Sequence, residues 1–390
     1  MNCWPALIVL SVAWALAISG SANAEDATPP NLPNSVAKDG LTFTYASSGG
    51  NCDTCEWVQL DGRISASAPD AFEEFLRQRE LIDIPLNVYL NSNGGSLHAG
   101  LELGKVFRRL RLATHVGTTI PSSGTDWADK EAAKEFREIG PGKCISACAY
   151  AFLGGTRREA EDGQVGVHRF FDPRSVQTPN EPIFSADDLG EQQKLSASIL
   201  EYVTAMGVAP EFVVTADRTP SDTYYYLTKE EMRRLKVVYD PATLTDWALQ
   251  QKSGGLLMSS KSGDGKKELS IFCEAGNKAR LEARYTALTS EDIKSFKETF
   301  ASVKDPFELL SIEIKKGATR LRTGSDFAVL SASLSDAQIA KLRNEKGDGQ
   351  FEVSNPRALQ GVFLIEMHST GFGSNLSLAM KNCLQAQAVR

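Results

Sequence analysis

The sequence predicts an α/β domain followed by a smaller, β-rich α+β domain. The chain has 390 residues, more than one hydrophobic core usually supports, so two domains are expected. Residues 41–250 alternate between strand-like and helix-like patterns, whereas residues 268–390 contain mostly strand patterns. Residues 251–267, which lie between them, are rich in Gly, Ser and Lys, and this composition is typical of a linker.

The N-terminus predicts export. Residues 6–18 are apolar apart from Ser11, and Ala22-Asn23-Ala24 then supplies the small-residue ending of a signal peptide, so residues 1–24 are expected to be removed. The apolar stretch is shorter than the roughly 20 residues that a membrane span needs. Residues 25–40 are polar and contain prolines, which favours a disordered leader. We therefore expect a periplasmic or secreted protein with no stable membrane span after signal removal.

The first domain is predicted to be built from alternating strands and helices. In order, the expected elements are strands at 41–45 and 57–64, a helix at 68–79, a strand at 86–90, a helix at 96–110 and a strand at 113–116. Residues 118–143 are a polar insertion with a charged helix expected at 127–137. Ser185 is the expected N-cap of a helix that ends at Gly207, and Thr228 opens a capping box. This alternation implies parallel strands with right-handed crossovers.

The second domain is predicted to be mostly strands with short helices. The expected strands are 269–274, 279–285, 309–315, 327–334 and 362–367, and the helices lie near 290–300 and 373–385.

Composition excludes some classes of function. The net charge of −7 gives no basic field, which argues against nucleic acid as a partner. His98, His115 and His368 have no companions at metal-ligand spacing, so the sequence predicts neither a metal site nor a cofactor.

The cysteines predict disulfides. Cys3 leaves with the signal peptide, and an exported protein retains Cys52, Cys55, Cys144, Cys148, Cys273 and Cys383 in an oxidising compartment. Cys273 and Cys383 are the natural pair of the second domain. In the first domain, local pairs compete with cross-pairs. The Cys52–Cys55 spacing also leaves open thiol–disulfide exchange as a third hypothesis for function.

Three segments of the first domain carry candidate chemistry. Asn93-Gly94-Gly95 joins a strand to a helix, Ser146 opens an apolar helix, and His168 ends a short strand. Taken singly, these residues are typical of a turn, an N-cap and a packed histidine. Taken together, they offer main-chain amides, a hydroxyl nucleophile and an imidazole base, the components that acyl transfer requires.

The order of these motifs resembles a known family. Asn91-Ser92-Asn93-Gly94-Gly95, then Cys144-Ile145-Ser146-Ala147-Cys148, then Val167-His168 are similar to the motifs of the proteolytic subunit of Clp protease and of the wider ClpP/crotonase superfamily, including signal peptide peptidase A. The resemblance covers roughly residues 57–240, with Asn93 in place of the family's proline. It implies a spiral of ββα units in the first domain.

The same resemblance implies roles for individual residues. Ser146 is the expected nucleophile, His168 the general base, and the amides of Gly94 and Ala147 the oxyanion hole. The family's aspartate position falls on Pro220, so Asp222 is the favoured third residue, with Asp217, or no acid at all, as the alternatives.

The sequence therefore predicts an exported, ATP-independent serine hydrolase, a peptidase acting on peptides or proteins. The competing hypothesis is an inactive ClpP-like binding or scaffold protein of the periplasm that recognises a peptide or protein partner. A homo-oligomer is left open.

Overall fold

The computed structural model describes residues 34–49, 55–123, 136–171, 185–252, 255–274, 278–304, 306–345, 349–353, 362–368 and 371–381. In these residues the protein is a mixed α/β structure with several sheets. Its buried apolar side chains form two separate cores, one running from Leu41 to Val237 and the other from Leu244 to Met380. The expected signal peptide and residues 25–33 of the expected leader lie outside the described residues.

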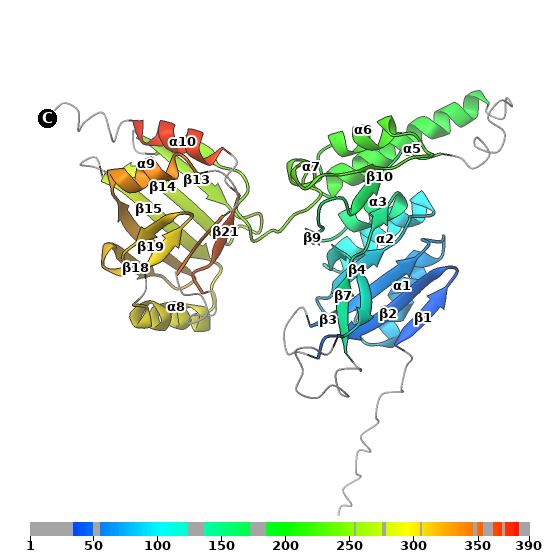
Figure 1. Ribbon diagram of the computed structural model, residues 1–390, viewed down its shortest axis with the longest axis horizontal. Helices are drawn as coiled ribbons and strands as arrows, with labels where there is room; N and C mark the ends of the chain where they lie inside the picture. The colour runs from blue at the N-terminus through cyan, green and yellow to red at the C-terminus, as the bar shows by residue number, and fades with distance from the viewer. Residues whose placement is uncertain are drawn as a thin grey trace, which may run out of the picture. The chain divides into compact units, whose positions relative to one another are not determined.

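The first core is built on a six-stranded sheet (Figure 1). Its strands, in sheet order, are β1 (Ser35–Lys38), β2 (Leu41–Ser47), β3 (Glu56–Gly62), β4 (Asn87–Asn91), β5 (Ala113–Val116) and β9 (Arg157–Glu159). From β3 to β9 the neighbours are parallel, as the sequence predicts. The β1–β2–β3 part is antiparallel.

Strand β1 corrects the expected leader, which was predicted to run to residue 40. Ser35–Lys38 pairs with β2, and the connection is the two-residue turn Asp39-Gly40, in which both residues have positive φ (49° and 88°). Two positive φ values are the signature of a type I′ hairpin, for which Asp-Gly is among the favoured sequences. The Asp39-Gly40 dipeptide is present in the sequence, but the polar composition of residues 25–40 led to the prediction of a disordered leader instead.

The helices of the first domain connect its strands along the chain. They are α1 (Ala68–Gln78), α2 (Leu97–Arg109), α3 (Ala147–Leu153), α5 (Ala186–Ala205), α6 (Glu211–Arg218) and α7 (Lys229–Arg234). The apolar face predicted for the first helix is confirmed, since Phe72, Phe75 and Leu76 are buried. Capping boxes at Ser185 and Thr228 open α5 and α7, as expected.

A small second sheet carries two of the three candidate segments. Its order is β11 (Tyr225–Tyr226), β10 (Val165–Val167) and β8 (Cys144–Ile145). Strands β8 and β10 are parallel, and β11 is antiparallel to β10. A further parallel bridge between Ser92 and Cys144 joins β8 to the chain that leaves β4.

The polar insertion differs from the prediction at its end. Thr118–Pro121 (β6) and Arg137–Gly140 (β7) pair as a two-stranded ribbon, so Arg137 belongs to a strand rather than to the expected helix. The rest of that expected helix, up to residue 135, lies outside the described residues.

The second core lies between antiparallel sheets and short helices, in agreement with the β-rich prediction. One sheet has the order β12 (Ala248–Lys252), β13 (Gly255–Lys261), β14 (Lys267–Glu274), β15 (Lys278–Thr286), β19 (Phe327–Leu334) and β18 (Thr319–Thr323). The other has the order β17 (Ile312–Ile314), β16 (Phe307–Leu309), β20 (Gly349–Val353) and β21 (Ile365–Met367). The helical segments are α8 (Ser290–Ser302), η2 (Lys316–Ala318), α9 (Asp336–Leu342) and α10 (Phe372–Ala379).

The linker predicted for residues 251–267 is wrong. Most of this segment forms the end of β12, all of β13 and the turn before β14. Leu257 and Met258 enter the core, and Ser262 Oγ donates to Asp264 at the turn (2.6 Å). The described small polar residues of this segment therefore belong to a sheet and to the turn between two of its strands. The two cores are divided along the chain between Val238 and Leu244 instead.

Candidate active site

Ser146 has an unusual backbone conformation between β8 and α3. Its φ and ψ are 59° and −124°, and a positive φ is uncommon for a residue other than glycine. Its N–H donates to the carbonyl of Gly166 in β10 (2.9 Å), so the chain must turn sharply to continue into α3. Strain of this kind persists only where the surrounding structure holds it, and it concentrates at functional sites.

The hydroxyl of Ser146 does not serve as an N-cap. No side-chain hydrogen bond from Ser146 caps α3, and the residue is half-buried rather than enclosed. By contrast, Ser96 at the start of α2 accepts the N–H of Ala99 (3.3 Å) in the ordinary way. The common structural role of a serine at a helix start is therefore not the role of Ser146.

The glycine loop, Asn93-Gly94-Gly95, lies directly against Ser146. A Cβ atom at Gly94 (φ 93°) would lie 2.7 Å from both Ser146 Cβ and the carbonyl oxygen of Ile145. One at Gly95 (φ 151°) would lie 2.1 Å from the carbonyl oxygen of Ile64. Only glycine fits at these two positions, because the backbone needs positive φ and the neighbours leave no room for a side chain.

The oxyanion donors differ from those the resemblance implies. The Gly94 N–H already donates to Ser92 Oγ (3.0 Å), so in this structure it is not free for a substrate oxyanion. The N–H of Gly95 donates no hydrogen bond to the described part of the chain. The Ala147 N–H begins α3, where backbone amides lack intrahelical partners. Among the described residues, the N–H groups of Gly95 and Ala147 have no partner, whereas the Gly94 N–H is engaged by Ser92, which sequence reasoning did not consider.

His168 follows β10, the strand beside β8. The parallel register sets Val165 beside Cys144 and Gly166 beside Ile145, so the residue level with Ser146 is Val167 rather than His168. His168 is 7% exposed, and burial lowers the pKa of its ring, an effect partly opposed by the Arg169 backbone. A hydrogen bond between the Ser146 hydroxyl and His168 is not among those that the described residues form.

The Nδ1 nitrogen of the His168 ring has no carboxylate hydrogen-bonded to it among the described residues. Nδ1 is buried and has no hydrogen-bond partner within the described ranges. The rings of Tyr224 and Phe171 pack against the imidazole instead, with centroids at 5.3 and 5.9 Å. Asp217 and Asp222 are exposed, and neither side chain is bonded to the histidine. The structure thus does not bring the expected third residue, Asp222, to the site.

A polar groove of about 370 Å³ adjoins the glycine loop. It lies where β3 and β4 end, and its lining includes Asp61, Arg63, Asn91, Lys143 and both glycines. Strand ends beside a glycine-rich loop offer exposed main-chain groups to a ligand.

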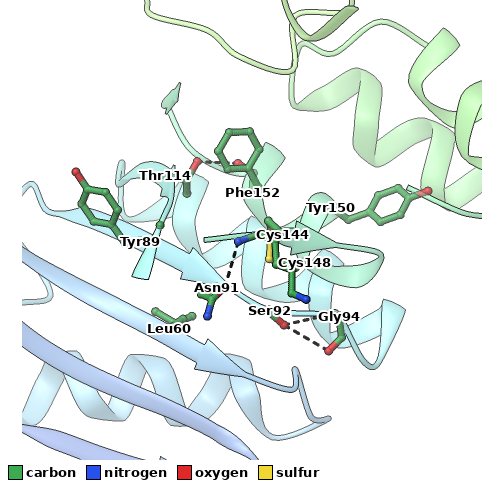
Figure 2. The surroundings of a disulfide bond; sticks show 12 residues. Leu60, Tyr89, Asn91, Ser92, Gly94, Thr114, Cys144, Cys148, Tyr150 and Phe152 are labelled. Carbon is green, nitrogen blue, oxygen red and sulfur yellow. Dashed lines mark hydrogen bonds between the residues drawn. A yellow bond between two sulfur atoms is a disulfide. The ribbon is translucent and has the colours of Figure 1, made fainter. Parts of the chain in front are cut away.

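The disulfide of the first domain is local. Cys144 and Cys148 are bonded to each other, with Cα atoms 5.1 Å apart (Figure 2). This settles the choice between local and cross-pairs for these two residues. Cys55 and Cys273 each take part in a further disulfide. Cys52 and Cys383 lie outside the described residues.

Two further findings bear on the class of site. Among the described residues, no group of three or more His, Cys, Asp or Glu side chains is arranged to hold a metal ion. In the same part of the chain, no helix is both long enough and apolar enough to cross a bilayer.

Comparison with known proteins leaves the site to be interpreted on its geometry. No protein-family model matches the chain, and no curated protein sequence matches it significantly.

Proposed function

We propose that this protein is an exported serine hydrolase, a peptidase, with a ClpP/crotonase-like spiral in its first domain. The observation that carries the proposal is the positive φ of Ser146 (59°) at a strand-to-helix turn, with its hydroxyl unused as a cap. A strained turn of this kind exposes the nucleophilic Oγ in serine hydrolases of another fold.

The proposed reaction is acyl transfer through a Ser146–His168 dyad. His168 Nε2 takes the hydroxyl proton while Ser146 Oγ bonds to the substrate carbonyl carbon. The Ala147 N–H and an amide of the glycine loop stabilise the negative oxygen that forms. The intermediate collapses as its C–N bond breaks and the leaving amine receives the proton from His168, which leaves an acyl–Ser146 ester. Water then gives a proton to His168 and bonds to the ester carbon, and the bond to Ser146 Oγ breaks as Oγ takes that proton back.

The electrostatics of the dyad are consistent with this role. A buried histidine with a lowered pKa is neutral at physiological pH, and a base must be neutral to accept a proton. Because Nδ1 has no partner among the described residues, no carboxylate holds the ring in the tautomer that a base needs. We therefore expect slower turnover than a complete triad would give.

Export is supported by the N-terminal apolar stretch and by the buried disulfide, because disulfides persist in oxidising compartments. The peptide substrate is proposed from the groove beside the glycine loop, which is lined by polar side chains and main-chain groups but not by Ser146 or His168.

The alternative is an inactive binding protein with the same fold. The hydrogen bond from the Gly94 N–H to Ser92 Oγ favours it, because one expected oxyanion donor is engaged within the protein itself. The lack of a partner for His168 Nδ1 among the described residues favours it as well.

Labelling with a fluorophosphonate probe distinguishes the two proposals. The mature protein, without residues 1–24, is incubated with the probe, and the modified residue is located by mass spectrometry. A hydrolase is expected to be labelled on Ser146, and Ser146→Ala should abolish the labelling. Ser96→Ala is the matched control, since Ser96 caps α2. A folded wild-type protein that is never labelled would identify the inactive binding protein.

A further inference from the structure

The Cys144–Cys148 disulfide encloses Ser146 in a small covalent loop, which we call the serine elbow. Cys144 belongs to β8 and Cys148 to the first turn of α3, with Ser146 midway between them. Both cysteines are fully buried. A buried disulfide is shielded from thiolate attack, so this bond is a structural link rather than an exchange centre.

Each end of the serine elbow is anchored on a different part of the candidate site. On the β8 side, the Cys144 N–H donates to the main-chain carbonyl of Gln164 (2.9 Å), and the Ile145 N–H donates to the main-chain carbonyl of Ser92 (2.9 Å). Ser92 is the residue whose hydroxyl accepts the Gly94 N–H, so β8 is coupled to the glycine loop. Figure 2 shows the disulfide together with the hydrogen bond between Ser92 and Gly94.

On the α3 side, the helix is packed tightly against α2. A Cβ at Gly100 in α2 would lie 2.4 Å from the Ala147 carbonyl oxygen, so α3 cannot move toward α2. The disulfide therefore links two separately anchored elements across the strained residue.

The strain at Ser146 requires such a link. A non-glycine residue in a sparsely populated region of φ and ψ costs about 1–3 kcal/mol, and the chain gains by relaxing. Relaxation would rotate the peptide between β8 and α3 and change the separation of the two Cα atoms, now 5.1 Å. A disulfide permits only a narrow range of that separation. The bond thus opposes the motion that would relieve the strain.

We propose that the Cys144–Cys148 disulfide is a positioning device, which holds Ser146 at positive φ and keeps its Oγ and the Ala147 N–H aligned toward the glycine loop. The inference deepens the proposed hydrolase function and rests on it for its catalytic consequence. The conformational part, that the bond maintains the positive φ, stands independently of catalysis.

The conformational part is tested by the preference for glycine at position 146. Glycine tolerates positive φ, whereas alanine is strained there. With the disulfide intact, Ser146→Gly should melt at a higher temperature than Ser146→Ala. In the Cys144→Ala/Cys148→Ala background the order should reverse, because at ordinary φ alanine is the less costly residue. An unchanged order in both backgrounds would overturn the proposal.

The catalytic part is tested by the labelling rate in proteins that keep Ser146. Cys144→Ala/Cys148→Ala should react with the fluorophosphonate probe about 10²-fold more slowly, the cost of misplacing a reacting group by about 1 Å. Cys273→Ala/Cys383→Ala, which removes the pair expected in the second domain, is the matched control and should react at the wild-type rate. A folded elbow variant that reacts at the wild-type rate refutes the positioning role.

The outcomes are separable. If the wild-type protein is never labelled, the proposed hydrolase function fails, while the melting order still decides whether the disulfide maintains the backbone. If the double alanine variant does not fold, Cys144→Val/Cys148→Ala refills part of the buried volume, and the same comparisons are made in that background.

Discussion

Replacing Gly94 by alanine tests the arrangement of the glycine loop and Ser146. The new Cβ would lie 2.7 Å from Ser146 Cβ, 2.7 Å from the Ile145 carbonyl oxygen and 3.0 Å from the Ala147 nitrogen. Two of these atoms belong to the backbone, so they cannot rotate away as the end of a long side chain can. The loop or the elbow must therefore move apart.

The magnitude follows from two terms. Alanine at a φ of 93° costs about 1 kcal/mol, and overpacking adds about 1–3 kcal/mol. The expected loss of stability is therefore about 2–4 kcal/mol. The displacement also moves Ser146 from the oxyanion donors, and a shift of about 1 Å lowers a reaction rate about 10²-fold.

The assay pairs thermal unfolding with the rate of fluorophosphonate labelling. Gly163→Ala is the matched control, because Gly163 also has positive φ (73°) but a Cβ there meets nothing within 4 Å. It should lose only about 1 kcal/mol and keep the wild-type labelling rate. Our reasoning is refuted if folded Gly94→Ala is labelled as fast as Gly163→Ala.

Three further outcomes are expected. Asp222→Asn should change the labelling rate less than about 3-fold, because no described carboxylate is bonded to the imidazole. His168→Ala should lower the rate at least about 10²-fold. A large effect of Asp222→Asn would show that Asp222 acts as the third catalytic residue after all. The labelling rate should fall as the pH drops through the lowered pKa of His168, below about 6.5. Tyr224→Ala, by admitting water to the imidazole, should raise the midpoint of this pH profile. An unchanged midpoint would exclude burial as the cause of the lowered pKa. Arg158→Leu should lower the free energy of unfolding by about 2 kcal/mol or more, because the buried guanidinium donates to the Lys236 and Val237 carbonyls (2.8 Å each). Arg157→Leu is the control, since the Arg157 side chain is half-exposed. Equal losses of stability in the two variants would contradict this account.

The regular elements were largely readable from the sequence because their signals are local. The apolar face of α1, the capping boxes of α5 and α7, and the alternating pattern of β14, β15 and β19 each lie within one short segment. Errors arose where composition was used in place of pattern. The Gly- and Ser-rich linker is part of a sheet, and the end of the polar leader is a hairpin strand.

The candidate site was only partly readable. The glycine loop does lie against Ser146, since Gly94 contacts the elbow, and His168 follows the strand adjacent to β8. The joint action of Ser146 and His168 stays a prediction. The role of Ser92 was missed, although it stands two residues before Gly94, because only the loop geometry turns its hydroxyl onto the Gly94 N–H. The sequence likewise left open whether a carboxylate is bonded to His168 Nδ1. Among the described residues, none is.

By itself the sequence determined the mixed α/β character, the order of the elements and the segments that hold a hydroxyl, an imidazole and flexible amides. Only the tertiary structure decided that Ser146 adopts positive φ, that Gly94 gives its N–H to Ser92 and that aromatic rings rather than a carboxylate surround His168. The physical reason is range. Periodicity and capping act within a few residues, whereas a backbone strain or an unpaired donor is fixed by partners such as the Gly166 carbonyl, which other strands contribute.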